Sequence, residues 1–233
     1  MIRLDERLHC AFDLLRGSVA VADIGCDHGK LSAALLLDGG CSRVVAGDIS
    51  PDCLDKTRRI IEQYALQDRA QIRLGGGLSI LTPGECDAAA ILGMGGELIA
   101  EMLKEAPVVA ERMERLVLQP MSGIEELRQW LYENSYHVEK DRLVFVGSRW
   151  YQLLCVRKGD GPDPWPRGFP ERCWLAGYRA YADREALLGP YCAEQLKKRR
   201  DRLKQAAGTA GEEKLFREAE QLEQIIKEID QWN

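Results

Sequence analysis

The feature that most constrains the fold is the stretch over residues 19–29, whose sequence is VAVADIGCDHG. A short apolar run rich in β-branched residues ends in Asp23, and a loop with Gly25 and Gly29 leads directly into a helical pattern over residues 30–37. Strand, tight turn and helix N-terminus in this order are typical of the place where an open α/β sheet binds an adenosine-type cofactor. Glycines there let a ligand lie against the backbone, close to free N–H groups and partial positive charge.

The spacing of the glycines indicates which cofactor this loop favours. A dinucleotide site needs G-x-G-x-x-G so that a pyrophosphate can approach the chain. Asp27 stands at the middle position, and its carboxylate would repel a pyrophosphate. Asp23 and Asp27 instead suit a ligand with a positive centre and an amino group. S-adenosylmethionine (SAM) has both and carries no phosphate, so the loop predicts SAM as the cofactor.

Length and charge limit the other possibilities. With 233 residues, the chain is long enough for one large core and a smaller appendage. Its net charge of −5 makes no overall case for nucleic-acid binding, so such a function would need a local basic patch. No apolar run approaches the roughly 20 residues of a membrane span. The start of the chain lacks the apolar core of a signal peptide, so we expect no membrane partner.

The cysteines indicate a reducing compartment. All eight are scattered without a C-x-x-C pair, and several lie in apolar runs, where a free thiol behaves as a small hydrophobe. We therefore expect structural, reduced thiols, no bound metal and a cytoplasmic location.

Apolar runs alternate with helical patterns over the first two thirds of the chain. Strands are predicted at residues 19–23, 43–49, 70–74, 86–92 and 115–119, and helices at 4–16, 30–37, 51–64, 97–105 and 124–134. This alternation predicts a parallel sheet covered by helices on both faces. Two extended runs, 136–146 and 149–157, meet at a Gly-Ser pair and predict a hairpin that adds one antiparallel strand.

The last third of the chain follows a different pattern. A segment rich in glycine and proline at residues 159–170 marks a boundary, which predicts a cofactor-binding domain at 1–160 and a helical domain at 161–233. Helices are predicted over 174–207 and 212–232, separated by residues 208–211. In the second helix, apolar residues repeat at four-three spacing, as in a coiled-coil seam, namely Leu215, Ala219, Leu222, Ile226 and Ile229. Cys192, Leu196, Leu203 and Ala206 face them, which predicts a coiled-coil hairpin.

Acidic and glycine residues at the strand ends are the candidate cofactor ligands. Asp48 closes the second strand, where an acid accepts the ribose hydroxyls of an adenosine ligand; its alternative role is a helix cap. Asp23 suits the amino group of a methionine moiety, unless it only caps the turn. The glycine-rich exit of the third strand would lie beside adenine, or form a simple turn. The predicted cofactor-binding residues are Asp23, Gly25, Cys26, Asp48, Ile49, Gly76, Gly77, Gly93 and Met94.

The exit of the fourth strand faces the position of the reacting atom. Enzymes that methylate an exocyclic amine commonly carry an Asn/Asp-Pro-Pro-aromatic clamp there, whereas this chain has Gly-Met-Gly-Gly at residues 93–96. A strand end that offers the substrate mainly backbone atoms, without such a clamp, fits a substrate whose ring nitrogen is the nucleophile. His28 either touches substrate or cofactor, or is structural, and it shares no metal-ligand spacing with His9 or His137. The predicted catalytic residues are Asp27, His28, Gly95 and Gly96.

A basic cluster lies on the first predicted helix of the C-terminal domain. Such a run is either a solvated helix face or a surface for phosphate contacts. Because it has one sign in an acidic chain, we interpret it as the candidate substrate-binding surface. Its members are Lys197, Lys198, Arg199, Arg200, Arg202 and Lys204.

Taken together, these motifs resemble the bacterial family of class I SAM-dependent methyltransferases that modify N1 of adenosine 22 in the tRNA D-loop. The resemblance rests on Asp-Ile-Gly-Cys-Asp-His at 23–28, Arg-Leu-Gly-Gly-Gly-Leu at 73–78, Ile-Leu-Gly-Met-Gly-Gly at 91–96 and Leu-Gln-Pro at 118–120. It implies a Rossmann-like, mostly parallel seven-stranded sheet, SAM as methyl donor, and tRNA as partner, held partly by the helical appendage. Lys30 and Met121 depart from the family pattern near the expected cleft.

We hypothesise a direct in-line mechanism for this reaction, and two other functions stay open. The lone pair of adenine N1 attacks the methyl group in line, and the Asp27 carboxylate stabilises the positive charge that develops on the ring. A second hypothesis is that the protein methylates a small molecule or a protein and uses the coiled coil for dimerisation. A third is a non-catalytic RNA-binding protein with a degenerate nucleotide fold. The sequence leaves the choice between monomer and dimer open.

Overall fold

The computed structural model describes residues 2–159, 166–167, 169–170, 173–206 and 211–232. By their internal contacts, the residues form two compact units, Met1–Lys140 with Val144–Asp163, and Asp141–Leu143 with Pro164–Asn233. The predicted boundary between residues 160 and 161 lies outside the described residues, so the two-domain division stays a prediction. No helix in the described part of the chain is long and apolar enough to cross a membrane.

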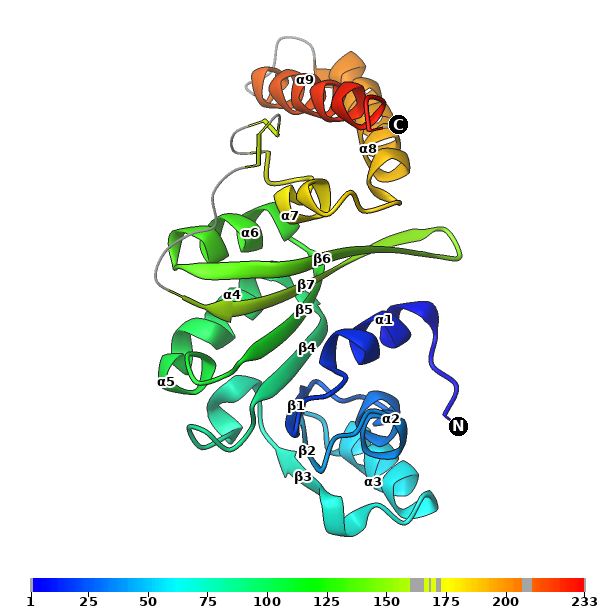
Figure 1. Cartoon of the computed structure of the whole chain (residues 1–233), viewed down its shortest axis with the longest axis vertical. Coiled ribbons are helices and arrows are strands. Elements are labelled where there is room, and N and C mark those ends of the chain that lie inside the picture. Colours follow the sequence, from blue (N-terminus) through cyan, green and yellow to red (C-terminus); the bar gives the residue numbers. More distant parts are fainter. Residues whose placement is uncertain (1, 160–165, 168, 171–172, 207–210, 233) are drawn as a thin grey trace. The chain divides into compact units, whose positions relative to one another are not determined.

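The first unit is built on a Rossmann-like seven-stranded sheet, which confirms the predicted fold class (Figure 1). Its strands are β1 (Ala20–Ile24), β2 (Arg43–Asp48), β3 (Ala70–Leu74), β4 (Ala88–Gly95), β5 (Arg115–Ser122), β6 (Tyr136–Val146) and β7 (Arg149–Lys158), in the order β3-β2-β1-β4-β5-β7-β6. β1 pairs in parallel with β2 and β4, whereas β5 and β7 are antiparallel. The strand order reverses between β1 and β4, where open α/β sheets bind ligands.

Helices cover both faces of this sheet. Figure 1 shows α1 (Glu6–Leu15), α2 (Lys30–Asp38) and α3 (Pro51–Gln63) on one side, and α4 (Gly96–Glu105) and α5 (Pro107–Ala110) on the other. α6 (Ile124–Glu133) packs against α4. Two short 3-10 helices, η1 (Gln67–Arg69) and η2 (Gly77–Ile80), flank β3. Coverage on both faces explains why the central strands read as continuous apolar runs.

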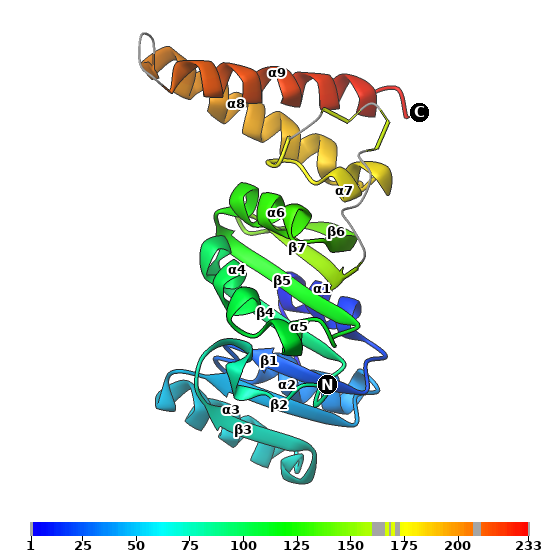
Figure 2. The same ribbon diagram turned by 90° about the vertical axis from the view of Figure 1, so that its left-hand side faces the viewer.

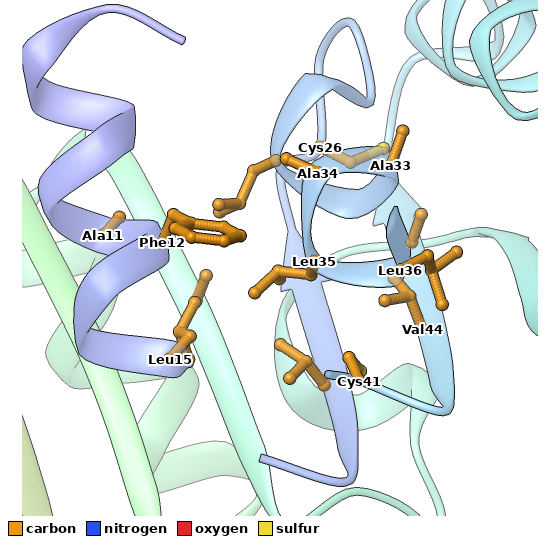
Figure 3. Packing of buried hydrophobic residues seen from close by; sticks show 14 of the residues in the cluster. Ala11, Phe12, Leu15, Cys26, Ala33, Ala34, Leu35, Leu36, Cys41 and Val44 are labelled. Carbon is orange, nitrogen blue, oxygen red and sulfur yellow. The ribbon is translucent and has the colours of Figure 1, made fainter. Parts of the chain in front are cut away.

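The core of the first unit holds the strand ends in place. Phe12 and Leu15 of α1 pack toward Leu35 of α2 (Figure 3). On β4, residues 88–91 are wholly buried. Three of them are alanines, and their small side chains leave room for helices on both sides. The Ser50 hydroxyl accepts a hydrogen bond from the Cys53 amide and Pro51 opens α3, which begins at the residue that the sequence predicted.

One difference from the sequence prediction lies at the end of β4. The strand runs from Ala88 to Gly95 rather than over 86–92, and its pairing with β5 shifts register between Leu92 and Gly95. Gly93 has φ +77°, which interrupts the regular pleat and produces a bulge. Bulges re-aim the chain at sheet ends, and this one lies at the predicted reaction edge.

The second unit contains α7 (Tyr178–Ala182), α8 (Leu188–Ala206) and α9 (Glu212–Ile229). The prediction of one helix over 174–207 was therefore wrong. α7 ends in a Schellman-type turn, because the Glu185 amide donates to the Ala180 carbonyl while Arg184 adopts φ +53°. An arginine rather than a glycine takes this left-handed position, so the sequence carried no stop signal. Residues 208–210 of the predicted break lie outside the described residues.

α8 and α9 lie side by side as a helical hairpin (Figure 2). Leu196 of α8 and Ala219 and Leu222 of α9 are buried, as the predicted seam requires. Ile225, however, is fully buried, whereas Ile226 is only partly buried. The seam therefore steps by three residues after Leu222, where the sequence pattern predicted a step of four.

Candidate functional site

A cavity of about 470 Å³ opens at the carboxyl ends of β1 and β4, at the point where the strand order reverses. Its volume lies within the range of about 300–1,000 Å³ that is typical of small-molecule sites. The residues that line it are Asp5, Arg7, Leu8, Asp23, Gly25, Cys26, Asp27, His28, Lys30, Leu31, Leu92, Gly93 and Met94. The structure thus brings together seven of the predicted site residues.

The loop after β1 is held in an unusual backbone conformation. Gly29 has φ +65°, and a Cβ there would lie 2.7 Å from Cγ2 of Thr57, so only glycine lets α2 begin against α3. Asp27 has φ +47°, which non-glycine residues rarely adopt. Its amide donates to Oδ2 of Asp48 at 3.3 Å, and its carbonyl accepts from Oγ1 of Thr57 at 3.2 Å. These bonds fix the loop between two strand ends.

Asp23 is a buried carboxylate in the wall of this cavity, with only 4% of its surface exposed. The Ser32 hydroxyl donates to its Oδ2 at 2.6 Å. Burial raises the pKa of Asp23 to about 6, against the lowering effect of the bonds from Ser32. Within the described ranges, no cation forms an ion pair with Asp23. At neutral pH the cavity therefore contains a poorly solvated negative charge, which suits a cationic group on a ligand.

Asp48 is held at the end of β2 by two backbone amides. Its Oδ1 accepts from Ser50 at 2.9 Å, and its Oδ2 accepts from Asp27 at 3.3 Å. Ser50, not Asp48, caps α3. The fixed carboxylate therefore remains available as a ribose ligand, although neither Asp48 nor Ile49 lines the 470 Å³ cavity.

The predicted adenine contacts lie beside Asp48 rather than in the cavity. Ile49 is 77% exposed at the end of β2. A Cβ at Gly76 would approach Cγ2 of Ile49 to 3.1 Å, and Gly77 has φ +64°. Gly76 keeps the surface beside Ile49 clear of a side chain, whereas Gly77 is buried and a Cβ there would lie 3.1 Å from Cγ of Met102. Gly76 and Gly77 are not among the residues lining the cavity.

The fourth-strand exit divides between two cavities. Gly93 and Met94 line the first, and a Cβ at Gly25 would lie 2.4 Å from Cε of Met94, so Met94 reaches the loop after β1. Gly95 and Gly96 instead line a second cavity of about 1110 Å³ at the N-termini of α4 and α6. The structure therefore does not place the four predicted catalytic residues together.

Gly96 has a packing role that the sequence did not reveal. A Cβ at Gly96 would lie 2.1 Å from the carbonyl oxygen of Gly123, just before α6. Close approach of the two helix starts requires glycine at this position. This contact accounts for Gly96 without any contact to a substrate.

Asp27 and His28 form an exposed pair at the cavity mouth. Nε2 of His28 lies 3.6 Å from Oδ2 of Asp27, an ion pair only when the imidazole is protonated. Both side chains are more than half exposed, so the pair adds little to stability. Among the described residues, no group of three or more His, Cys, Asp or Glu side chains could hold a metal ion.

Sequence reasoning missed the wall that α1 contributes to the cavity. Nη1 of Arg7 donates to Oε1 of Gln119 at 2.9 Å, and its guanidinium lies 5.7 Å from the ring centroid of Tyr151. The cap by Asp5 could have located the start of α1 and placed Arg7 in its first turn. No local sequence pattern, however, predicts the contact between Arg7 and Gln119, which are 112 positions apart in the sequence.

The basic cluster on α8 contains one residue that faces inward. Arg199 is 7% exposed, and it donates to Glu218 of α9 at 3.1 Å and to Gln195 at 2.9 Å. Its prediction as a substrate contact is corrected, because burial in the hairpin seam withdraws it from the surface. The other five cations are exposed.

Three of the exposed cations on α8 have acidic neighbours. The pairs are Lys198–Glu194 at 2.7 Å, Arg200–Glu223 at 2.8 Å and Lys204–Asp201 at 2.9 Å. Lys197 and Arg202 form no such pair with the described residues. The net positive charge of this surface is therefore smaller than the sequence suggests.

Comparison with known proteins identifies the family. Residues 4–154 match the methyltransferase domain family. Over 159 residues, the chain is 31% identical to the tRNA (adenine(22)-N(1))-methyltransferase of Bacillus subtilis, covering 68% of this chain and 67% of that protein. The chain belongs to the tRNA (adenine(22)-N(1))-methyltransferase family. The resemblance predicted from the sequence motifs is thereby confirmed.

Solved structures of the family share the fold over nearly the whole chain. The B. subtilis m1A22 tRNA methyltransferase TrmK is 25% identical, has a TM-score of 0.79, and aligns with 99% of both chains. TrmK of M. capricolum in complex with S-adenosyl-homocysteine is 21% identical and also has a TM-score of 0.79, covering 97% of this chain and 98% of that one. The methyltransferase fold of this family thus includes the helical hairpin.

Proposed function

We propose that this protein transfers a methyl group from SAM to N1 of adenosine 22 in the D-loop of tRNA. The observation that carries the proposal is the buried Asp23 carboxylate in the cavity at the strand-order reversal, in a chain that belongs to this family. The B. subtilis relative is named for this reaction, and the M. capricolum neighbour binds S-adenosyl-homocysteine. Both support the same assignment.

The residues that line the cavity, together with Asp48 at the end of β2, fit SAM. Asp23 offers a negative charge that no cation among the described residues pairs with, which suits an ammonium group. Asp48, fixed by two amides, suits vicinal hydroxyls. Asp27 occupies the position that a diphosphate would need, and its carboxylate disfavours a phosphate ligand.

The chain's residues have to position the base rather than activate it. SAM, when bound, supplies a methyl group made electrophilic by its sulfonium. Adenine N1 is unprotonated at neutral pH, so no general base is required, and positioning accounts for most of the rate. The bulge at Gly93 provides backbone, not bulky side chains, where the extruded base would rest; extrusion costs a few kcal/mol. The exposed Asp27 carboxylate stabilises the positive charge that develops on the ring.

The helical hairpin supplies the basic surface that tRNA needs. Lys197 and Arg202 of α8 are exposed and form no ion pair within the described part of the chain. Contacts of such cations with phosphates do not depend on the nucleotide sequence, and they weaken as the salt concentration rises. We place the reaction in the cytoplasm, because the cysteines that the structure describes are free thiols.

Mapping of the methylated nucleoside tests the proposal. The protein is incubated with methyl-labelled SAM and unmodified tRNA, and with the same tRNA in which guanosine replaces adenosine 22. We expect label in 1-methyladenosine at position 22 of the first tRNA and none in the second. Label elsewhere, or only on a small molecule or a protein, would contradict the proposed substrate.

A further inference from the structure

The hairpin of β6 and β7 ends in an exposed segment, residues 144–151, which we call the β6–β7 tip. β6 ends at Val146 and β7 begins at Arg149, so a turn of two residues joins the strands. Gly147 in this turn has φ +63°, and no atom lies within 4 Å of the position that a Cβ would take there. Figure 1 shows the tip projecting past the other strands of the sheet. The β6–β7 tip is therefore open to a partner.

Side chains of the β6–β7 tip alternate between two faces, as they do along any strand. Val144 and Tyr151 pack against the hydrophobic core cluster that includes α1. Phe145 and Trp150 follow on the opposite face, across the strand pair from each other, and their ring centroids are 4.7 Å apart. Phe145 keeps 41% of its surface exposed. The core thus fixes one face of the tip, while the other face presents an aromatic ring that Trp150 supports.

The charge of the β6–β7 tip is positive. It contains no aspartate or glutamate, although the whole chain has a net charge of −5. Arg149 is exposed and forms no ion pair with the residues that the structure describes. A guanidinium donates hydrogen bonds to phosphate oxygens, and an exposed aromatic ring stacks on a base of any kind. The two features together match an unpaired nucleotide, which offers both a phosphate and a base.

The β6–β7 tip lies beside the cavity that contains Asp23. The ring centroid of Tyr151 is 5.7 Å from the guanidinium of Arg7, which lines that cavity. Along β7, only one residue, a rise of about 3.3 Å, separates Tyr151 from Trp150, which contacts the exposed ring of Phe145. A tRNA with adenosine 22 at the cavity would therefore bring the neighbouring nucleotides close to the tip.

We propose that the β6–β7 tip binds an unpaired nucleotide next to adenosine 22 of the tRNA. The base of this nucleotide stacks on Phe145, whose ring is supported by Trp150, and its phosphate accepts hydrogen bonds from Arg149. This contact holds the RNA strand beside the extruded adenosine and lies in the same unit as the cofactor cavity. The inference rests on the proposed substrate and assigns a further surface that recognises it, besides the basic residues of α8.

Fluorescence anisotropy with labelled, unmodified tRNA measures the two contacts separately. Phe145→Ala should raise Kd by about 5- to 30-fold, the range for losing one stacked base, and should leave the salt dependence unchanged. Phe145→Tyr should keep the wild-type affinity, whereas Phe145→Leu, which retains the apolar bulk without a ring, should not. Arg149→Gln should weaken binding and reduce the slope of log K against log salt by about one, because one phosphate contact is lost.

A fluorescent base in the RNA tests where the nucleotide lies. 2-Aminopurine is placed at either position that flanks adenosine 22, and its emission depends on the groups that stack on it. At one of the two positions, the emission of the bound RNA should differ between the wild type and Phe145→Ala. Identical emission at both positions would contradict stacking of a neighbouring nucleotide on the β6–β7 tip.

Matched controls separate these contacts from effects on folding or overall charge. Arg59→Gln removes an exposed charge from α3 and should leave the tRNA affinity unchanged. Every variant should bind SAM with the wild-type Kd in calorimetry, because no residue of the β6–β7 tip lines the cavity. If Phe145→Ala also loses SAM affinity, the comparison of Phe145→Tyr with Phe145→Leu decides whether the ring is needed.

Unchanged tRNA affinity in both Phe145→Ala and Arg149→Gln would overturn the inference. Conversion of a dimer to a monomer by Phe145→Ala at constant tRNA affinity would also overturn it, because the tip would then join two copies of the chain. If the wild-type protein does not bind tRNA, the proposed function fails as well. If it methylates position 22 while the variants bind tRNA as the wild type does, only this inference fails.

Discussion

Replacing Asp23 with asparagine should stabilise the free protein at neutral pH while damaging its site. The carboxylate is buried and has no cationic partner within the described ranges, so keeping it ionised costs folding free energy. Asparagine has nearly the same shape, and its Oδ1 can still accept the hydrogen bond from Ser32. The variant removes the charge and keeps most of the packing.

The size of the effect follows from the pKa of Asp23, which burial raises from 3.8 to about 6. Each unit corresponds to about 1.4 kcal/mol, so ionisation costs the folded state about 3 kcal/mol at pH values well above 6. A raised pKa contributes stability that is fully present below the unfolded value and is lost as pH rises through about 6. The advantage of Asp23→Asn is therefore largest above pH 6 and smaller in acid.

Urea unfolding of both proteins at pH 7.5 and pH 4.5, followed by circular dichroism, measures this difference. We expect Asp23→Asn to unfold with a free energy about 1–3 kcal/mol higher at pH 7.5, and we expect this gain to shrink by about 2 kcal/mol at pH 4.5. Asp68→Asn, a change at an exposed aspartate, should alter the free energy by less than about 0.5 kcal/mol. A variant that is less stable than wild type at pH 7.5, or a difference independent of pH, would show that the ionised Asp23 carboxylate does not destabilise the folded protein.

Three further predictions concern turnover, packing and RNA binding. Asp27→Ala should lower the turnover number for tRNA by about 100-fold at saturating SAM, because a charge-stabilising group is removed; full activity in a single-turnover assay would eliminate this role. Gly96→Ala should cost about 1–3 kcal/mol of stability, since its Cβ would overlap the carbonyl of Gly123, and an unchanged melting temperature would contradict that contact. The double variant Lys197→Glu, Arg202→Glu should weaken tRNA binding in filter assays and flatten its salt dependence, while SAM affinity stays constant; unaltered tRNA affinity would remove α8 from the interface.

Local patterns in the sequence predicted most of the first unit. The β1 loop, the start of α3 at Pro51 and the hairpin at Gly147 each depend on a few adjacent residues, and the structure confirms them. The end of α7 was missed because Arg184 takes a left-handed conformation that glycine usually adopts. In the helical hairpin, tertiary packing selected Ile225 rather than Ile226 for the seam.

The site was predictable only where it follows a strand. Asp23 and Asp48 end neighbouring strands, so topology alone places them near each other. The contact of Arg7 with Gln119 joins α1 to β5, and the close approach of Gly96 to Gly123 joins two helix starts. Neither contact produces a periodic pattern in the sequence, because each depends on how separate helices and strands pack against one another.

We infer that the glycine loop interrupted by Asp27, beside the buried Asp23 carboxylate, selects a sulfonium amino acid cofactor over any diphosphate. Calorimetric titration of the wild-type protein with SAM, NADH and ATP at pH 7.5 measures this selectivity. We predict saturable one-to-one binding of SAM and no heat of binding from NADH or ATP. Tight binding of NADH or ATP together with exclusion of SAM would contradict this selectivity.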